Sequence, residues 1–260
     1  MACDRIGLLF LVLDGLSQPG VWRRFLSGQE GKYATYTHAK FPHRVELDFL
    51  RDTLIPEYVP THHSMFFPHH VLAQALLALL RHALADPRIG KFVYLSQTCA
   101  PICTFPDAYQ ALLADDSSWV TCQGGFWPER YERLVPQSGI PPEKFGTSSC
   151  WIALNRRHAQ TLLDAEPQWL PKFIHVPAAD EHYAPTILKM AGCSAECKPY
   201  NPTHVDWVRG SPYAYGQLTA EDFEQLSQGP HLFARKFSPE SNLAARWDEL
   251  LQRRARRRVP

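Results

Sequence analysis

The 260-residue sequence lacks an excess of charge of either sign, because 27 lysine and arginine residues face 26 aspartate and glutamate residues. A net charge of +1 gives no general attraction to nucleic acid or to an anionic membrane, so we expect no nucleic-acid partner. Long apolar runs are missing too. The run near the start, residues 6–13, has eight residues, whereas a membrane-spanning helix needs about 20. The sequence therefore predicts neither a transmembrane segment nor a signal peptide.

Two devices for binding phosphate are also absent. The chain has no Asp-x-Asp motif to hold a metal-chelated pyrophosphate and no glycine-rich loop of the P-loop or dinucleotide type. If the protein binds a nucleotide, lysine and arginine side chains must neutralise the phosphates. The seven cysteines are odd in number and occur without a secretion signal, which favours reduced thiols, although Cys193 and Cys197 would pair in an oxidising compartment.

What is present is an alternation of apolar runs with helical patterns, which is typical of an α/β layer fold. Apolar runs predict strands over residues 6–13, 33–38 and 92–96, and the apolar spacing predicts an amphipathic helix over 71–83. We expect a single domain over residues 1–260 that ends in a basic tail, residues 252–260.

Two other segments stand out by their composition. The proline-rich stretch 124–146 predicts a long functional loop. Residues 180–190 predict a helix with Asp180 and Glu181 in its first turn, where the helix dipole favours carboxylates.

Two pairs of histidines, His62-His63 and His69-His70, form the most conspicuous cluster of one residue type. Neutral imidazoles are zinc and copper ligands, so the cluster suggests a metal-dependent hydrolase. Neighbouring histidines point in different directions, however, and Pro68 interrupts the segment. Loop and helix-cap roles are the favoured interpretation.

Charged residues in an aromatic setting recur along the second half of the chain. They occur in Ala179-Asp180-Glu181-His182-Tyr183, in Asp206-Trp207-Val208-Arg209-Gly210 and in Phe233-Ala234-Arg235-Lys236-Phe237. Upstream lie Arg130-Tyr131, Ser149-Cys150-Trp151 and Asn155-Arg156. Together and in this order, these segments resemble the core-2/I-branching glycosyltransferase family (glycosyltransferase family 14), which includes protein xylosyltransferases and plant branching-enzyme-like proteins. The resemblance spans almost the whole chain.

The resemblance implies a GT-A-like α/β fold with a mixed central sheet flanked by helices. It also implies inverting transfer of a sugar, GlcNAc or xylose, from a UDP-sugar to a hydroxyl of a glycan or glycoprotein, with no divalent metal or other cofactor. Inversion needs a base for the acceptor proton and a cationic site for the departing diphosphate. By position, Glu181 is the base, and Lys236 with Arg235 beside it binds the diphosphate.

Further roles follow from the same resemblance. Arg209 stands in for a second cation that family members carry in a segment where this chain has no lysine or arginine. Ser149 and Trp151 shape the donor pocket, with core packing as the alternative for Trp151. The resemblance places Arg130, Trp207 and Asp180 on the acceptor side: Arg130 as a binding residue, Trp207 as a stacking face, and Asp180 as a residue that orients its segment or caps the helix.

A non-catalytic carbohydrate- or nucleotide-binding descendant of the fold is the alternative function, and a metal hydrolase built on His62, His63, His69 and His70 is a further one. Family members are usually Golgi proteins with a membrane anchor and a stem, whereas the first predicted strand here already begins at Ile6. The expected location is therefore cytoplasmic or peripheral at a membrane.

Overall fold

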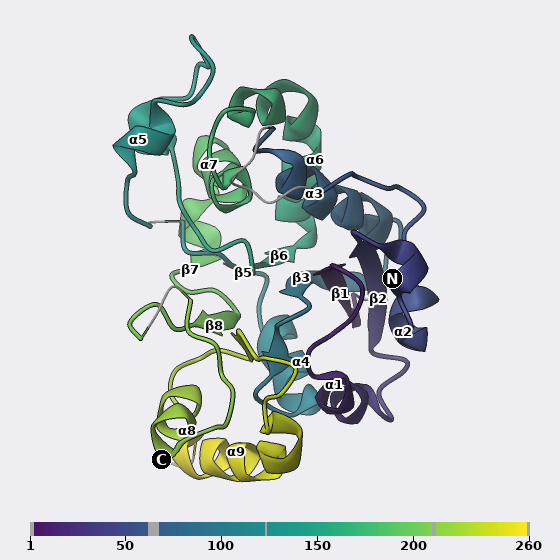
Figure 1. Ribbon diagram of the computed structural model, residues 1–260. Helices are drawn as coiled ribbons and strands as arrows, with labels where there is room; N and C mark the ends of the chain where they lie inside the picture. The colour runs from purple at the N-terminus through teal and green to yellow at the C-terminus, as the bar shows by residue number, and fades with distance from the viewer. Residues whose placement is uncertain (1–2, 62–67, 123, 210–211, 259–260) are drawn as a thin grey trace.

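The computed structural model describes residues 3–61, 68–122, 124–209 and 212–258. Its central feature is a six-stranded sheet in the order β2-β1-β3-β6-β5-β7 (Figure 1). The strands are β1 (Arg5–Val12), β2 (Tyr33–Ala39), β3 (Ile89–Ser96), β5 (Ser118–Trp119), β6 (Ala153–Asn155) and β7 (Cys197–Lys198). Strands β2, β1 and β3 are parallel, β6 is antiparallel to both of its neighbours, and β5 is parallel to β7. The sheet is therefore mixed, as expected.

The two longest strands lie at the centre because their sequences are almost continuously apolar. Leu8, Leu9 and Phe10 of β1 are fully buried, and so are Val93 and Leu95 of β3. Strands of a parallel sheet are covered on both faces, which is why they read as unbroken apolar runs. The three strands predicted from such runs are confirmed.

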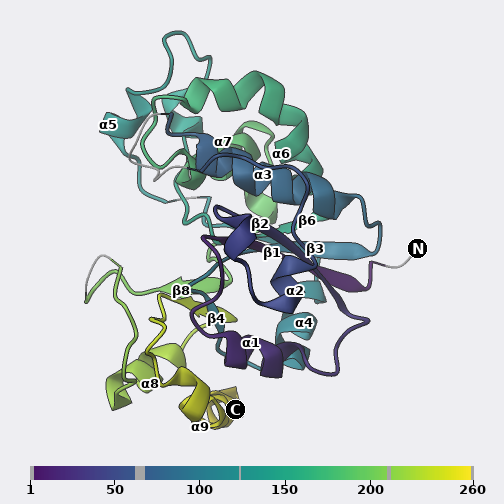
Figure 2. The same cartoon turned by 45° about the vertical axis from the view of Figure 1, so that its right-hand side comes forward.

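Helices cover both faces of this sheet (Figures 1 and 2). On one face lie α3 (Val71–Leu84), α6 (Arg156–Trp169) and α7 (Tyr183–Met190), and on the other lie α1 (Pro19–Leu26) and α4 (Phe105–Leu113). The predicted helix over 71–83 is confirmed as α3. Within the described residues, no helix has both the length and the apolar character that crossing a bilayer requires.

A second, three-stranded sheet has the order β4-β9-β8, with β4 (Ala100–Pro101), β8 (Thr203–Val205) and β9 (Phe233–Arg235). Below it in Figure 1 lie α8 (Ala220–Leu226) and α9 (Leu243–Arg258). Trp22 of α1 stacks on Phe233 with ring centroids 5.8 Å apart, and its Nε1 donates to the Cys99 carbonyl at 2.9 Å. Buried aromatic contacts of this kind join the second sheet to α1, one of the helices that cover the first sheet.

The remaining elements are short. They are α2 (Asp48–Arg51), α5 (Pro128–Tyr131) and the 3-10 turns η1 (Pro42–Arg44), η2 (Pro142–Lys144), η3 (Leu170–Phe173), η4 (Ala179–Glu181) and η5 (Ser194–Glu196). Thus the stretch 124–146, predicted as a loop, contains one helical turn and one 3-10 turn.

The predicted helix over 180–190 is wrong in its first turn. Asp180 and Glu181 lie in η4, and α7 begins only at Tyr183. The Glu181 carbonyl accepts a hydrogen bond from the backbone N–H of Ser148 at 2.9 Å, and Ala178 has a left-handed backbone with φ 52°. These long-range and local constraints hold the two carboxylates outside the helix.

The basic C-terminal residues continue helix α9 as far as Arg258. Arg254 is buried and donates to the carbonyls of Leu226 and His231, both at 2.6 Å. Arg257 pairs with Glu224. The segment predicted as a basic tail is therefore partly a packing element of the second sheet's helical layer.

Candidate functional site

An open pocket of about 840 Å³ lies where loops from the two sheets meet. Pockets of 300–1,000 Å³ are typical of small-molecule sites. Its wall combines aromatic and polar side chains with two glycines, and the lining residues are Thr121, Gly124, Gly125, Trp127, Arg130, Thr147, Ser148, Ser149, Glu181, Pro199, Tyr200, Asn201, Thr203, His204, Val205, Trp207 and His231. Four residues predicted from the sequence, Arg130, Ser149, Glu181 and Trp207, are thus brought together in one pocket.

Glu181 and Arg130 form an ion pair in this pocket. Arg130 Nη1 donates to Glu181 Oε2 at 3.0 Å, and the two side chains are 24% and 30% exposed. The Arg130 guanidinium also lies over the Trp127 ring, 4.9 Å from its centroid. A carboxylate held by a charge-assisted hydrogen bond, but still open to the pocket, has a fixed position and remains accessible to a ligand.

His182 binds the same guanidinium nitrogen of Arg130 as Glu181 does. Its Nδ1 lies 2.9 Å from the Gly146 carbonyl, and because a carbonyl only accepts, Nδ1 carries the proton. Nε2 then accepts from Arg130 Nη1 at 3.0 Å. Burial lowers the pKa of His182 to about 4, so the ring is neutral near pH 7 and keeps this lone pair. The ring also stacks on Phe145 at 4.6 Å.

This positioning role was not predicted, although His182 belongs to the Asp-Glu-His-Tyr motif. The loop partner reaches the histidine because Gly146 lies against α7. A Cβ on Gly146 would lie 2.8 Å from Pro185 Cβ, and the Gly146 N–H donates to Thr186 Oγ1 at 3.0 Å. A glycine followed many residues later by a histidine is too weak a pattern to predict such a contact.

Asp180 does not line the pocket, contrary to its predicted place on the acceptor side. It borders a small apolar cavity of about 20 Å³, together with Tyr94 and Cys150. Its Oδ1 is buried and has no hydrogen-bond partner among the described residues. Burial, and then the charge of Glu181, raise the pKa of Asp180 to about 6. The two adjacent carboxylates therefore lie in different environments: Glu181 in the open pocket and Asp180 in the core.

The predicted donor residues Arg235, Lys236 and Trp151 lie beside the pocket wall rather than in its lining. Arg235 pairs in register with Val205, which lines the pocket. Its guanidinium lies 4.6 Å from the centroid of the Trp151 ring. Trp151 is 8% exposed. Its side chain therefore packs in the core and also contacts Arg235.

Lys236 and Arg235 form no ion pair with any described residue. Burial, and then the charge of Arg235, lower the pKa of Lys236, and Arg235 Nε is buried without a hydrogen-bond partner in the described part of the chain. Two partly buried cations without a counter-charge form a site that favours an anion.

Arg209, the predicted second cation, is engaged elsewhere. Its Nε donates to Asp206 Oδ2 at 2.6 Å and its Nη2 lies 2.9 Å from Asp222 Oδ1. Both carboxylates are buried, and the guanidinium stacks on Tyr213, 4.0 Å from the ring centroid. Because two carboxylates already neutralise Arg209, this geometry assigns it to the structure of the loop and disfavours a role in binding phosphate.

Trp207 lies at the rim of the pocket and is 55% exposed. An exposed indole offers a ring face on which a sugar can stack. Ser149 lines the pocket, and its carbonyl accepts a hydrogen bond from Asn201 Nδ2 at 3.3 Å.

Asn201 is a pocket residue that sequence reasoning missed. Its Oδ1 accepts from the Thr121 N–H at 3.0 Å, and its Nδ2 donates to Ser148 Oγ at 3.1 Å. One buried amide thereby joins three loops of the pocket wall, a role for which the sequence gives no signal.

The histidine cluster has only two members within the described residues, because His62 and His63 lie outside them. His70 precedes the first residue of α3, and burial lowers its pKa. The backbone N–H of His69 donates to the Ile174 carbonyl at 3.1 Å. His70 thus occupies the N-cap position of α3, but its side chain makes no capping hydrogen bond there.

The mixed sheet covered by helices on both faces, with a polar pocket at its junction with a smaller sheet, is a GT-A-like α/β fold. Comparison with known proteins then identifies the family. The model of the Core-2/I-Branching enzyme family matches residues 6–227, so the chain belongs to this family.

Among curated proteins, the chain is similar to "Glycosyltransferase BC10" of Oryza sativa subsp. japonica. The two are 26% identical over 242 residues, covering 78% of this chain and 57% of the relative's length. The chain thus spans little more than half the length of that relative. The family match includes Arg130, Ser149 and Glu181 but ends before Arg235 and Lys236.

Proposed function

We propose that the protein is a glycosyltransferase that moves a sugar from a UDP-sugar to a hydroxyl of a glycan or glycoprotein, with inversion at the anomeric carbon. The observation that carries the proposal is the Glu181 carboxylate, which is open to the pocket and held by Arg130. Membership of the Core-2/I-Branching enzyme family and similarity to a protein named as a glycosyltransferase support it.

Glu181 acts as the general base. As the acceptor hydroxyl attacks the anomeric carbon, its proton passes to the carboxylate, the new glycosidic bond forms, and the bond from carbon to the diphosphate oxygen breaks. The Arg130 hydrogen bond to one oxygen fixes the carboxylate, and the neutral His182 fixes Arg130. Positioning of this kind accounts for a large share of enzymatic rate enhancement.

Lys236 and Arg235 stabilise the departing UDP. The diphosphate gains negative charge as the bond to the sugar breaks, and two cations without carboxylate partners meet that charge. Since the chain has no Asp-x-Asp motif, we propose that no divalent metal takes part at the diphosphate. Trp151, stacked on Arg235, limits where that guanidinium can lie.

GlcNAc and xylose are the donor sugars that we propose to test first. A thermal-shift panel of UDP-sugars would rank them, and the preferred donor should raise the melting temperature in a concentration-dependent way.

A non-catalytic carbohydrate- or nucleotide-binding protein is the second candidate. The pairing of Arg209 with Asp206 and Asp222 favours it, because one fewer cation is available for the diphosphate. An assay of UDP release with mixed glycan acceptors separates the two candidates. The hydrolase based on the histidine cluster gains no support, since His69 and His70 belong to no group of potential metal ligands within the described residues.

The variant Glu181→Gln tests the proposed base. It should abolish UDP release in the presence of acceptor while UDP binding, measured by calorimetry, stays within twofold of wild type. Glu143→Gln is a matched control, because Glu143 is an exposed glutamate in another 3-10 turn. Turnover by Glu181→Gln at the rate of that control would remove Glu181 as the base.

A further inference from the structure

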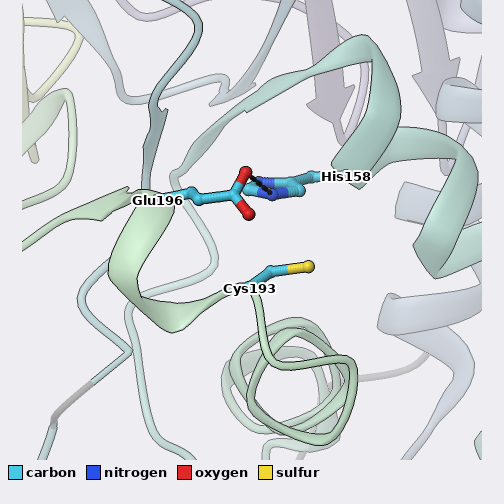
Figure 3. A group of neighbouring side chains, drawn as sticks. All are labelled: His158, Cys193 and Glu196. Atoms are coloured by element: carbon cyan, nitrogen blue, oxygen red, sulfur yellow. Dashed lines mark ion pairs between the residues drawn. The ribbon is translucent and has the colours of Figure 1, made fainter.

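A second cluster of reactive side chains lies outside the pocket. His158 Nε2, Cys193 Sγ and a carboxylate oxygen of Glu196 all lie within 4.8 Å of one another. They come from the first turn of α6, from the segment after α7 and from η5, and Figure 3 shows the three side chains converging. Two segments distant in sequence, the start of α6 and residues 193–196, therefore present nitrogen, sulfur and oxygen donors to one point.

The imidazole is already oriented as a metal ligand. His158 is fully buried, and its Nδ1 lies 2.7 Å from Ser118 Oγ. Its Nε2 lies 3.2 Å from Nη2 of Arg157. Because a guanidinium only donates, Nε2 carries the lone pair and Nδ1–H donates to Ser118. Metal-bound histidines show the same arrangement, with the second ring nitrogen donating to a fixed acceptor.

A second thiol lies against this group. Cys197 follows Glu196 directly, and its thiol interacts with both His158 and the Cys122 thiol. Cys197 Sγ is not among the donor atoms that lie within 4.8 Å of one another, so the Cys197 side chain would turn towards them to supply a fourth donor.

A cation already lies among these donors. The Arg157 guanidinium is 3.6 Å from Cys193 Sγ, 3.2 Å from His158 Nε2 and paired with Glu196. Its side chain is 53% exposed, so it can turn towards solvent without opening the core. The three donor atoms thus surround the positive charge of the Arg157 guanidinium. A metal ion that binds them would take the place of this guanidinium.

We propose that His158, Cys193, Glu196 and Cys197 bind a zinc ion in a structural site, with Arg157 displaced to solvent. Sulfur, nitrogen and carboxylate oxygen in a four-coordinate set are the ligands that zinc takes in proteins. Binding deprotonates the two thiols, and their protons pass to solvent. The ion takes no part in sugar transfer, since none of the four ligands lines the pocket.

Such a site would stabilise one wall of the pocket. Pro199, Tyr200 and Asn201 line it, and they follow Cys197 within four residues. Thr121, which is bound by Asn201, is adjacent to Cys122. A zinc ion on Cys193, Glu196 and Cys197 would hold the strand that leads into this wall.

The test is cobalt and zinc binding by the full-length protein purified under reducing conditions. We expect about one zinc per chain by elemental analysis, and after exchange a cobalt spectrum with the strong visible bands of tetrahedral thiolate coordination. Cys193→Ser should abolish the bands. Ser118→Ala should weaken cobalt binding by about tenfold, since it removes the partner of the His158 ring. Cys3→Ser is the matched control, an exposed cysteine elsewhere.

Arg157→Ala keeps the proposal falsifiable if a ligand variant fails to fold. Because it removes the competing cation, it should tighten cobalt binding several-fold. The proposal is overturned if neither wild type nor Arg157→Ala gives the cobalt bands, or if Arg157→Ala binds cobalt no more tightly than wild type. It is also overturned if mass spectrometry of protein purified without reductant shows Cys193 and Cys197 joined in a disulfide.

Discussion

The buried carboxyl of Asp180 makes stability depend on pH in a direction that can be calculated. Burial raises its pKa from the ordinary 3.8 to about 6 in the folded protein. Below pH 3.8 the group is protonated in both the folded and the unfolded chain and costs nothing. As the pH rises towards 6, the unfolded chain ionises first, so the folded state loses stability, and above 6 the loss is constant.

The size of this loss follows from the shift of about two pKa units. At 1.36 kcal/mol per unit it is about 3 kcal/mol, an upper limit because the residue as a whole is partly exposed. The pH dependence of wild-type stability does not by itself report the loss caused by Asp180, because a second buried group titrates in the same range. The neighbouring His182, with its pKa lowered to about 4, acts in the opposite direction and destabilises the fold as the pH falls from 6.5 to 4.

The variant Asp180→Asn isolates the effect of the carboxyl. The difference in unfolding free energy, Asp180→Asn minus wild type, should rise by up to about 2.5 kcal/mol between pH 4 and pH 7.5, since part of the loss is already present at pH 4. The fixed cost of burying an amide cancels, because it is the same at every pH. Urea unfolding at half-unit pH steps measures the difference. A difference that stays flat or falls with pH would refute the reasoning, and a tenfold rise in the acceptor KM would return Asp180 to the acceptor side.

Three further substitutions test the other assignments. Arg209→Ala should lower the unfolding free energy by about 3 kcal/mol, because it leaves the buried Asp206 and Asp222 unpaired; a loss of UDP affinity without a loss of stability would restore its phosphate role. Lys236→Ala should weaken UDP binding at least fivefold in calorimetry, while Lys32→Ala, on an exposed lysine, should leave it unchanged. His182→Phe keeps the stacking on Phe145 but removes the acceptor of Arg130. It should lower kcat about tenfold, the equivalent of one lost hydrogen bond, and an unchanged kcat would show that Glu181 does not need this support.

The local pattern of apolar residues predicted the helices and strands correctly where burial alone determines the secondary structure. The apolar runs of β1 and β3 and the helical spacing of α3 are read directly from side-chain type, because these elements are buried on both faces or along one clear stripe. The start of α7 was placed wrongly, since a hydrogen bond from Ser148, 33 positions upstream of Glu181, holds the Glu181 carbonyl outside the helix. Long-range contacts of this kind have no local signature.

In the candidate site, too, some features follow from the local sequence and others depend on long-range packing. The motif order named both Glu181 and Arg130 as candidate site residues, and the structure brings them within 3.0 Å of each other although they are 51 positions apart in the sequence. It could not indicate that Asp180 turns to the core while Glu181 turns to the pocket. Adjacent residues point in different directions, and only the packing around each one decides which of the two is buried.

The availability of a cation for phosphate depends on its neighbours more than on its motif. Arg209, Arg235 and Lys236 all lie in segments that resemble the family, and by sequence all three were assigned to the diphosphate. Arg209 is already paired with two buried carboxylates, so moving it to a phosphate would leave both carboxylates unpaired in the interior, at a cost of about 3–5 kcal/mol. Arg235 and Lys236 have no carboxylate partner among the described residues, and a diphosphate beside them would relieve their mutual repulsion. The balance of charge that disfavours Arg209 at a phosphate therefore leaves Arg235 and Lys236 as the candidates for that role.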